Sequence, residues 1–211
     1  LLFAYGQIIP KKIIKSLKYG FWIVHPSLLP KYKGAFPFAY VLINNEEKTG
    51  VTLIQADEGI DTGEVIGQKE LLIGPDEKRP ELIDRLVDLG HELVKEKINE
   101  FIKGNFSLKT TKQKKAEHPI TKKLKREQGY VTVQALKKAM LKEGRHIYDF
   151  YRGLYPWPGI WTVVKIKGKE KRLKITDMAF STNKIILKKV QLEGKNEVDF
   201  KIFNLAYKIF I

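Results

Sequence analysis

Cysteine is absent from the 211-residue sequence. Without thiols the chain can form neither a disulfide framework nor a thiolate metal site, and this usage favours a reducing compartment, so we expect a cytoplasmic protein. Long apolar runs are also missing: none approaches the roughly 20 residues that span a bilayer, and no membrane partner is expected. The N-terminus lacks the basic, apolar and small-residue order of a signal peptide.

The chain opens on Leu1–Tyr5, which is apolar throughout and has neither a methionine nor a polar lead-in. A strand of this kind is typical of a parallel sheet covered on both faces. We therefore expect the chain to begin inside a fold and to lack an N-terminal portion. Its length and its 43% of apolar residues predict one large or two small globular domains.

Acidic residues are scarce in the second half. Residues 1–104 carry 14 Lys and Arg against 15 Asp and Glu, whereas residues 105–211 carry 25 against 9. A near-neutral half joined to a strongly basic half is typical of a catalytic module beside a polyanion-binding module. A merely solubilising basic surface is the alternative.

The first half predicts an α/β fold built on an incomplete parallel, Rossmann-like sheet over residues 1–104. Strand, helix and strand follow within 25 residues, which is the pattern of a parallel crossover unit. The expected strands are 1–5, 21–25, 51–56 and 65–73, and the expected helices are 10–17, 36–44 and 80–103. In the last helix, Leu82, Leu86, Leu89 and Leu93 fall on one apolar stripe.

The second half predicts a basic linker and a small domain. Residues 105–126 hold eight Lys or Arg and few apolar residues, so we expect a linker that is able to contact nucleic acid. A helical region, 133–154, precedes short runs at 161–166, 172–177, 184–190 and 198–203. Several short strands predict a small β-barrel of the oligonucleotide-binding (OB-like) type over residues 127–211, with Lys167 and Gly168 as a hairpin turn.

Two residues are candidates for acid–base chemistry. His25 ends a predicted buried strand, and Asp61 lies in a glycine-flanked loop after the predicted strand 51–56. Ligands bind outside the carboxyl ends of strands in parallel sheets, so both side chains are expected at one crevice. A carboxylate beside an imidazole fixes its tautomer and supports proton transfer near neutral pH. No pair of histidines has metal-ligand spacing, and no metal is expected.

These residues sit in motifs that resemble the folate-dependent formyltransferase family. The motifs are residues 25–30 (His-Pro-Ser-Leu-Leu-Pro), Lys33 and Gly34, residues 49–52 (Thr-Gly-Val-Thr) and residues 57–63 (Asp-Glu-Gly-Ile-Asp-Thr-Gly). Three later features resemble the branch that acts on methionyl-tRNA: Arg152 with residues 155–161, residues 190–207, and the basic second half. The resemblance runs from residue 1 to about 207 and begins about a third of the way into the family's sequence.

The resemblance implies transfer of a formyl group from 10-formyltetrahydrofolate to the amine of methionyl-initiator tRNA, with no metal. His25 would stabilise the tetrahedral oxyanion or carry protons, and Asp61 would orient His25 or relay protons through water. Ser27, Leu28, Leu29 and Pro30 match the loop that lines the folate site. For tRNA we expect contacts from the following basic residues: Lys112, Lys114, Lys115, Lys122, Lys123, Arg126 and Arg152.

One departure from the family affects the expected activity. The family has an asparagine two residues before its histidine, where it donates a hydrogen bond to the developing oxyanion; this chain has Ile23. Loss of one such donor typically lowers the rate by about 10²–10³. Together with the expected missing N-terminal portion, Ile23 predicts little activity for the chain as it stands.

Two alternative functions remain open at this point. The chain could formylate a small amine, such as a sugar nucleotide or a purine precursor, because such enzymes share residues 20–63 of the pattern. It could also be a degenerate paralogue that retains only nucleic-acid binding. The oligomeric state is open, with a monomer as the expectation.

Overall fold

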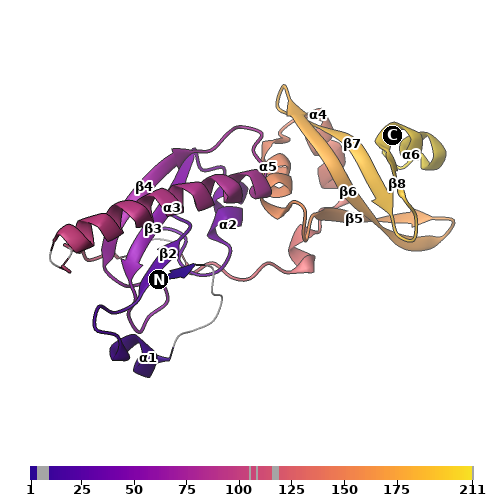
Figure 1. The fold of residues 1–211 in the computed structure, drawn as a ribbon. Helices are drawn as coiled ribbons and strands as arrows, with labels where there is room; N and C mark the ends of the chain where they lie inside the picture. Colours follow the sequence, from indigo (N-terminus) through magenta and orange to yellow (C-terminus); the bar gives the residue numbers. More distant parts are fainter. Residues whose placement is uncertain (4–9, 105, 108, 116–118, 211) are drawn as a thin grey trace. The chain divides into compact units, whose positions relative to one another are not determined.

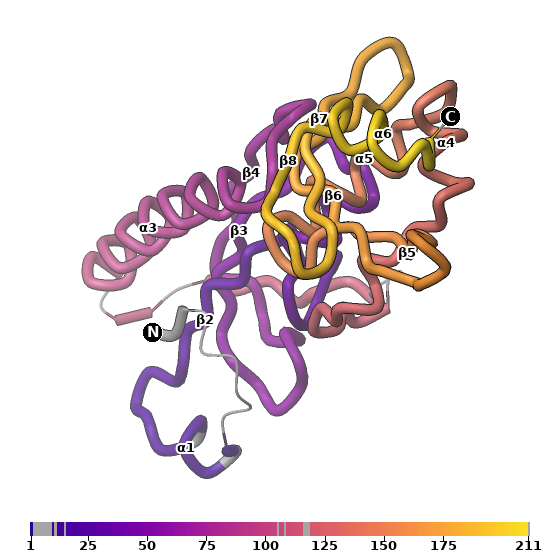
Figure 2. Tube along the Cα trace, turned by 90° about the vertical axis from the view of Figure 1, so that its right-hand side faces the viewer, coloured from indigo at the N-terminus to yellow at the C-terminus, as the bar shows by residue number. Residues whose placement is uncertain are grey.

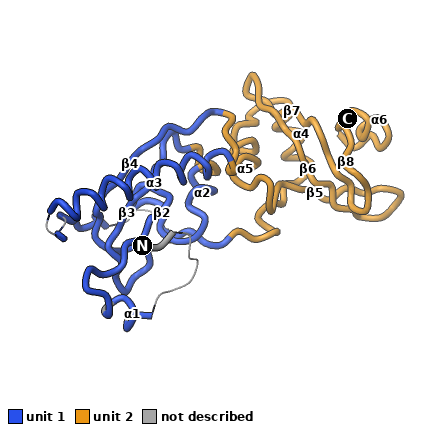
Figure 3. The backbone as a smooth tube through the Cα atoms, in the orientation of Figure 1, with its two compact units in different colours: residues 1–41, 46–75, 81–123 blue, residues 42–45, 76–80, 124–211 orange. Residues whose placement is uncertain are grey.

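The computed structural model describes residues 1–3, 10–104, 106–107, 109–115 and 119–210. It divides the chain into two compact units (Figure 3). Unit 1 comprises residues 1–41, 46–75 and 81–123, and unit 2 comprises residues 42–45, 76–80 and 124–211. The expected domain boundaries at residues 104 and 126 remain predictions.

A four-stranded sheet with the order β1-β2-β3-β4 forms the centre of unit 1 (Figure 1). Its strands are β1 (Leu2–Phe3), β2 (Trp22–His25), β3 (Lys48–Gln55) and β4 (Val65–Leu72). β1 and β2 pair in parallel and are connected through α1 (Lys11–Ser16), which confirms the predicted crossover. Residues 4–9, which include the end of the strand predicted at 1–5, lie outside the residues that the structure describes.

The expectation of a wholly parallel sheet is wrong. β3 runs antiparallel to β2 and to β4. Only residues 56–64 connect β3 to β4, and a parallel connection needs a dozen or more residues, usually including a helix. The sheet is therefore mixed, and the carboxyl ends of the neighbouring strands β2 and β3 point in opposite directions.

A long helix, α3 (Arg79–Lys103), lies across β3 and β4 (Figure 1). Its predicted apolar stripe is buried at Leu82, Leu86 and Leu93. Leu93 packs close to Gly67 of β4, since a Cβ added to this glycine would lie 3.1 Å from the leucine side chain. Burying such a stripe against a sheet is the main source of stability for a helix of this kind. The shorter α2 (Pro37–Ile43) precedes β3.

Unit 2 contains a second sheet, which is antiparallel and has the order β5-β6-β7-β8. Its strands are β5 (Ile160–Ile166), β6 (Lys169–Ser181), β7 (Lys184–Leu192) and β8 (Glu197–Asp199). Lys167 and Gly168 form the predicted turn, both with positive φ and with Ile166 paired to Lys169. The helices α4 (Val133–Leu141) and α5 (Arg145–Leu154) pack against this sheet, and a short 3-10 helix, η1 (Arg126–Gly129), precedes them.

Two expectations for unit 2 change. The closed OB-like barrel is not confirmed, because within the described residues β5 pairs with β6 and β8 pairs with β7, and these two edge strands do not pair with each other. The predicted strand 198–203 is wrong beyond Asp199: residues Phe200–Tyr207 form α6, which lies beside β7 and β8 (Figure 2). The Asp199 carboxylate caps α6 by accepting from the Lys201 N–H at 2.7 Å.

No helix in the described part of the chain is long and apolar enough to cross a membrane. The same residues contain no group of three or more His, Cys, Asp or Glu side chains that could hold a metal ion.

Candidate active site

His25 is the last residue of β2, and the residue is 5% exposed. Its Nε2 lies 2.9 Å from the carbonyl oxygen of Tyr32. Because a carbonyl can only accept, Nε2 must carry a proton that it donates to Tyr32. In the neutral ring, Nδ1 is therefore the basic nitrogen.

Asp61 faces this basic nitrogen. Its Oδ2 lies 3.4 Å from Nδ1 of His25 and accepts a hydrogen bond from the Gly34 N–H at 2.7 Å. Gly34 has a φ of +100°, and a side chain there would come within 2.5 Å of the Thr121 carbonyl oxygen. Glycine is therefore required at this position, where its amide aims the carboxylate at the imidazole.

The Asp61 loop reaches His25 by a different route from the one that the sequence predicts. Since β2 and β3 are antiparallel, His25 pairs with Thr52 in the middle of β3, and the end of β3 at Gln55 pairs with Trp22. The loop 56–64 returns toward His25, and Asp61 itself adopts a φ of +50°. The two side chains are close together, although the shared sheet edge that motivated the prediction does not exist.

Gln113 holds this loop in place. Its side-chain amide donates to the carbonyl oxygens of Asp61 at 2.9 Å and Gly63 at 2.7 Å. Within the loop, the Asp57 carboxylate accepts from the Gly59 N–H at 3.0 Å and the Thr62 hydroxyl at 2.6 Å. These bonds fix the backbone of Asp61 in the left-handed region, a conformation that costs of order 1 kcal/mol or more. Sequence reasoning missed Gln113, because its basic surroundings predict only a linker.

Burial dominates the charge state of His25. It lowers the pKa of the imidazole below its usual 6.5, with Lys33 acting in the same direction, while Asp61 and the Tyr32 carbonyl oppose the shift. A pKa below 6.5 favours the neutral ring at pH 7. The proton that Nδ1 can accept would complete an ion pair with the adjacent carboxylate.

The position of the family's asparagine lies on the same face of β2 as His25. Ile23 is two residues before His25 and pairs with Ile54 of β3. The hydroxyl of Thr52, the register partner of His25, is engaged by backbone groups and so is not available as a donor in place of the expected asparagine. Its hydroxyl donates to the Ser27 carbonyl at 2.6 Å and accepts from the Leu29 N–H at 3.0 Å.

The predicted folate loop separates into two kinds of residue. Ser27 and Leu29 are buried: the Ser27 hydroxyl donates to the Lys31 carbonyl at 2.7 Å, and Leu29 uses its N–H and carbonyl on Thr52 and Gln68. Leu28 and Pro30 are partly exposed. This loop can offer an apolar ring the side chains of Leu28 and Pro30, while Ser27 and Leu29 maintain its shape.

The predicted tRNA contacts do not all lie at the surface. Five are exposed lysines of unit 1: Lys112, Lys114, Lys115, Lys122 and Lys123. Arg126 is also exposed and begins η1 of unit 2. Arg152 is only 1% exposed, and its guanidinium is paired with Asp149 at 2.6 Å. A buried, paired guanidinium has no free face for a phosphate, so Arg152 is better explained as a core residue of α5.

Comparisons with known proteins agree with this fold and motif set. A family model described as "Formyl transferase" matches residues 1–98. Among solved structures, a likely sugar N-formyltransferase from Mycobacterium tuberculosis is similar over 92% of this chain and 73% of its own, at 22% identity and a TM-score of 0.60. HypX from Aquifex aeolicus, in complex with tetrahydrofolic acid, is similar over 96% of this chain and 37% of its own, at 17% identity and a TM-score of 0.67. The chain thus has a formyltransferase fold.

Sequence relatives narrow this class. Methionyl-tRNA formyltransferase from Citrifermentans bemidjiense is 31% identical over 99% of this chain and 69% of its own length. The enzyme of the same name from Thermodesulfovibrio yellowstonii is 37% identical over 83% of this chain and 52% of its own. The chain belongs to the methionyl-tRNA formyltransferase family, as the sequence motifs predict. Its matched part spans about half to two thirds of these relatives.

Proposed function

We propose that this protein transfers a formyl group from 10-formyltetrahydrofolate to the amino group of methionyl-initiator tRNA. The observation that carries the proposal is the pair of buried His25 and partly buried Asp61, with 3.4 Å between Nδ1 and Oδ2 and with the Nε2 proton donated to the Tyr32 carbonyl. The curated relatives named methionyl-tRNA formyltransferase support this acceptor.

The proton chemistry follows from the tautomer. Attack by an amine on a formyl carbon requires the amine to lose a proton, and the neutral Nδ1 of His25 can accept it directly or through one water. Asp61 then faces an imidazolium and stabilises it. The same imidazolium can return the proton to the leaving nitrogen. When bound, 10-formyltetrahydrofolate supplies the formyl group, and Leu28 and Pro30 are the loop side chains that would contact it.

The basic residues support the proposed acceptor of the formyl group, which is an amine carried by tRNA. Residues 105–211 carry 25 Lys and Arg against 9 Asp and Glu, whereas a formyltransferase for a small amine has no need of such an excess. Phosphate contacts supply much of the affinity of proteins for nucleic acids. We assign these contacts to the exposed lysines at 112, 114, 115, 122 and 123 and to Arg126, and we leave Arg152 out.

Filter binding of initiator tRNA at about 50 and 200 mM salt tests this acceptor. We expect binding that weakens steeply with salt, because phosphate contacts release counterions. The double variant Lys122→Gln/Lys123→Gln should bind more weakly and with a shallower salt dependence. The matched control is Lys95→Gln/Lys103→Gln, which removes two exposed lysines of α3.

Two results would contradict the assignment. The first is tRNA binding that does not respond to salt. The second is an equal loss of binding in the linker variant and in the α3 control. If the protein formylates an amino-sugar nucleotide and does not bind tRNA, the small-amine alternative is supported instead.

A further inference from the structure

We infer that unit 2 carries a binding pocket for an unpaired nucleotide of RNA, on the outward face of the antiparallel sheet. The pocket has a volume of about 250 Å³, and the side chains with the chemistry to bind a ligand are Arg126, Trp157, Trp161, Arg172, Lys174 and Glu193. The inference rests on the proposed function, since it takes the polyanion held by this protein to be RNA.

Strand register builds the floor of the pocket. Trp161 of β5 is the direct partner of Lys174 of β6, which in turn is the partner of Gln191 of β7. Directly paired residues share a face of the sheet, so these three side chains form one row. The flanking residues Leu173 and Ile175 are buried on the opposite face, which leaves the row facing solvent.

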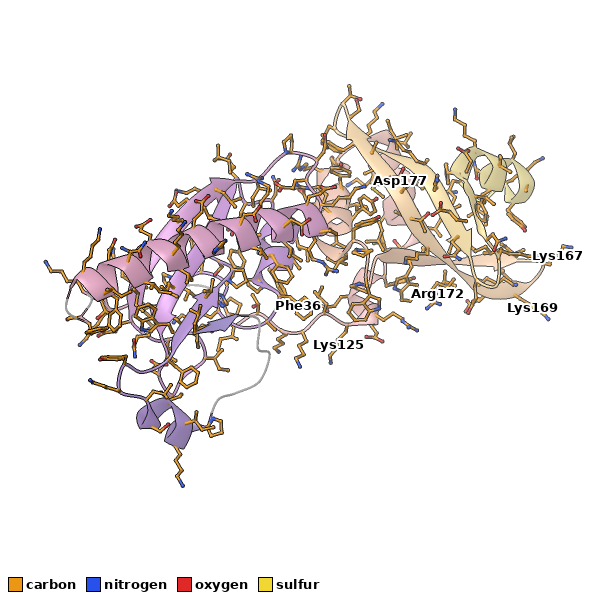
Figure 4. All side chains as sticks on the ribbon, in the orientation of Figure 1. Phe36, Lys125, Lys167, Lys169, Arg172 and Asp177 are labelled. Carbon is orange, nitrogen blue, oxygen red and sulfur yellow. The ribbon has the colours of Figure 1, made fainter. Side chains whose placement is uncertain are left out.

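A second row lies next to the first. Arg172 of β6 pairs with Val163 of β5 and, being two residues from Lys174, lies on the same outward face. Figure 4 labels Arg172 on this strand, with Lys167 and Lys169 marking the hairpin that joins β5 and β6. Arg172 and Lys174 therefore place a guanidinium and an ammonium side by side on an open sheet face.

The two tryptophans give this face its aromatic character. Trp157 is 49% exposed, which is unusual for an indole that serves only to fill a core. Trp161 is held in a fixed orientation: its Nε1–H donates to the Arg126 carbonyl at 2.9 Å, and its ring lies 5.0 Å from that of Tyr130. A fixed indole loses little conformational freedom on binding, which favours stacking with a planar ligand.

The positive charge and the aromatic rings of the pocket together select the ligand. Three cations, Arg126, Arg172 and Lys174, line the pocket together with one carboxylate, Glu193, whose Oε2 accepts from the Arg172 backbone N–H at 3.2 Å. Cations alone would suit any anion, and indoles alone would suit any apolar ring. Their combination is typical of sites in which a base stacks on an aromatic ring while its phosphate meets Arg or Lys. A base inside a duplex is covered on its faces by stacking on its neighbours, so the ligand that this pocket suits is an unpaired nucleotide.

The test uses the intact chain carrying Trp22→Phe, which removes the tryptophan of unit 1 and leaves the two pocket indoles as the only ones of the original three. Two probes are compared: a hexamer of riboadenylate and an abasic hexamer with the same sugars and phosphates. We expect the base-bearing strand to quench the indole fluorescence and to bind at least tenfold more tightly, because each stacked base contributes measurably to affinity.

Variants separate stacking from charge. Trp157→Ala should raise the Kd of the adenylate hexamer roughly tenfold and leave that of the abasic hexamer unchanged. Arg172→Gln should make the slope of log Kd against log salt shallower by about 0.7 for both probes. Trp161→Phe, which keeps a ring, should weaken binding less than Trp157→Ala does. The controls are Tyr207→Ala and Lys201→Gln on α6, outside the pocket lining.

Equal binding of the base-bearing and abasic strands would overturn the pocket as a base site and leave an anion site only. An equal effect of Trp157→Ala and Tyr207→Ala would overturn it as well. If initiator tRNA binds with the expected salt dependence while the two hexamers bind equally, this inference fails and the proposed function stands. If no RNA binds, both fail.

Discussion

Replacing Ile23 by asparagine is expected to raise the rate of formyl transfer at least tenfold. Ile23 shares a face of β2 with His25 and offers no hydrogen-bond donor. The Thr52 hydroxyl opposite His25 is already committed to Ser27. One oxyanion donor is typically worth about 10²–10³ in rate, and the backbone frame for it is present. The measurement is kcat and kcat/KM for formylation of methionyl-initiator tRNA by the chain and by Ile23→Asn.

The matched control is Ile23→Leu, which has the shape of asparagine but no donor. Thermal melts of both variants separate a change in chemistry from a change in folding, since a polar side chain next to buried Ile54 lowers stability. If Ile23→Asn folds and gains no more than Ile23→Leu, the position is not the site of a missing oxyanion donor.

Removal of the imidazole is expected to have the opposite effect. His25→Ala, made in the Ile23→Asn background where the rate is higher, should lower kcat by about 10²–10⁴, which is the usual contribution of general acid–base catalysis. KM should change little, because the imidazole acts on the reacting atoms. His91→Ala serves as the control, since His91 is an exposed histidine of α3.

A loss of less than tenfold for His25→Ala would exclude His25 as the proton carrier. A parallel loss in kcat and in the melting temperature would indicate a structural role instead. Because His25 also donates to Tyr32, His25→Gln is a useful second variant: it can keep that hydrogen bond while lacking an imidazole.

Most strands and helices of unit 1 could be predicted from local patterns, but the direction of strand pairing could not. Alternating and continuous apolar runs locate β2, β3, β4 and the Leu82–Leu93 stripe of α3, since burial dictates those residue types. Whether β3 lies parallel or antiparallel to β2 depends on contacts made far along the chain. The end of the sequence differs for another reason: the N-cap at Asp199 is a local signal, and the apolar residues after it form α6 instead of continuing the predicted strand.

The candidate site shows the same division. His25 and Asp61 stand out because their motifs are recognisable, yet the residues that hold them together do not. Gly34 contributes through its backbone N–H, and Gln113 acts from 52 positions beyond Asp61. Neither residue type predicts such a role. Conversely, Arg152 has the charge expected of a tRNA contact. Its spacing of three residues from Asp149 allows an ion pair on the predicted helix, but the sequence does not show that both side chains are buried.

The central claim is that neutral His25 accepts the proton of the amine at Nδ1. The measurement that tests this claim most directly is an NMR titration of the His25 ring nitrogens in 15N-labelled protein, with the signals assigned from the His25→Gln spectrum. We expect a neutral ring at pH 7 with its proton on Nε2, and a pKa below 6.5 because burial disfavours the charged form. The rate of formyl transfer should then fall as the pH drops through the His25 titration, in addition to the fall caused by protonation of the acceptor amine, whose ordinary pKa is about 8. Asp61→Asn should lower this pKa further, since the Asp61 charge opposes the shift. An imidazolium at pH 7, a neutral ring protonated on Nδ1, or a pKa that does not respond to Asp61→Asn would contradict it.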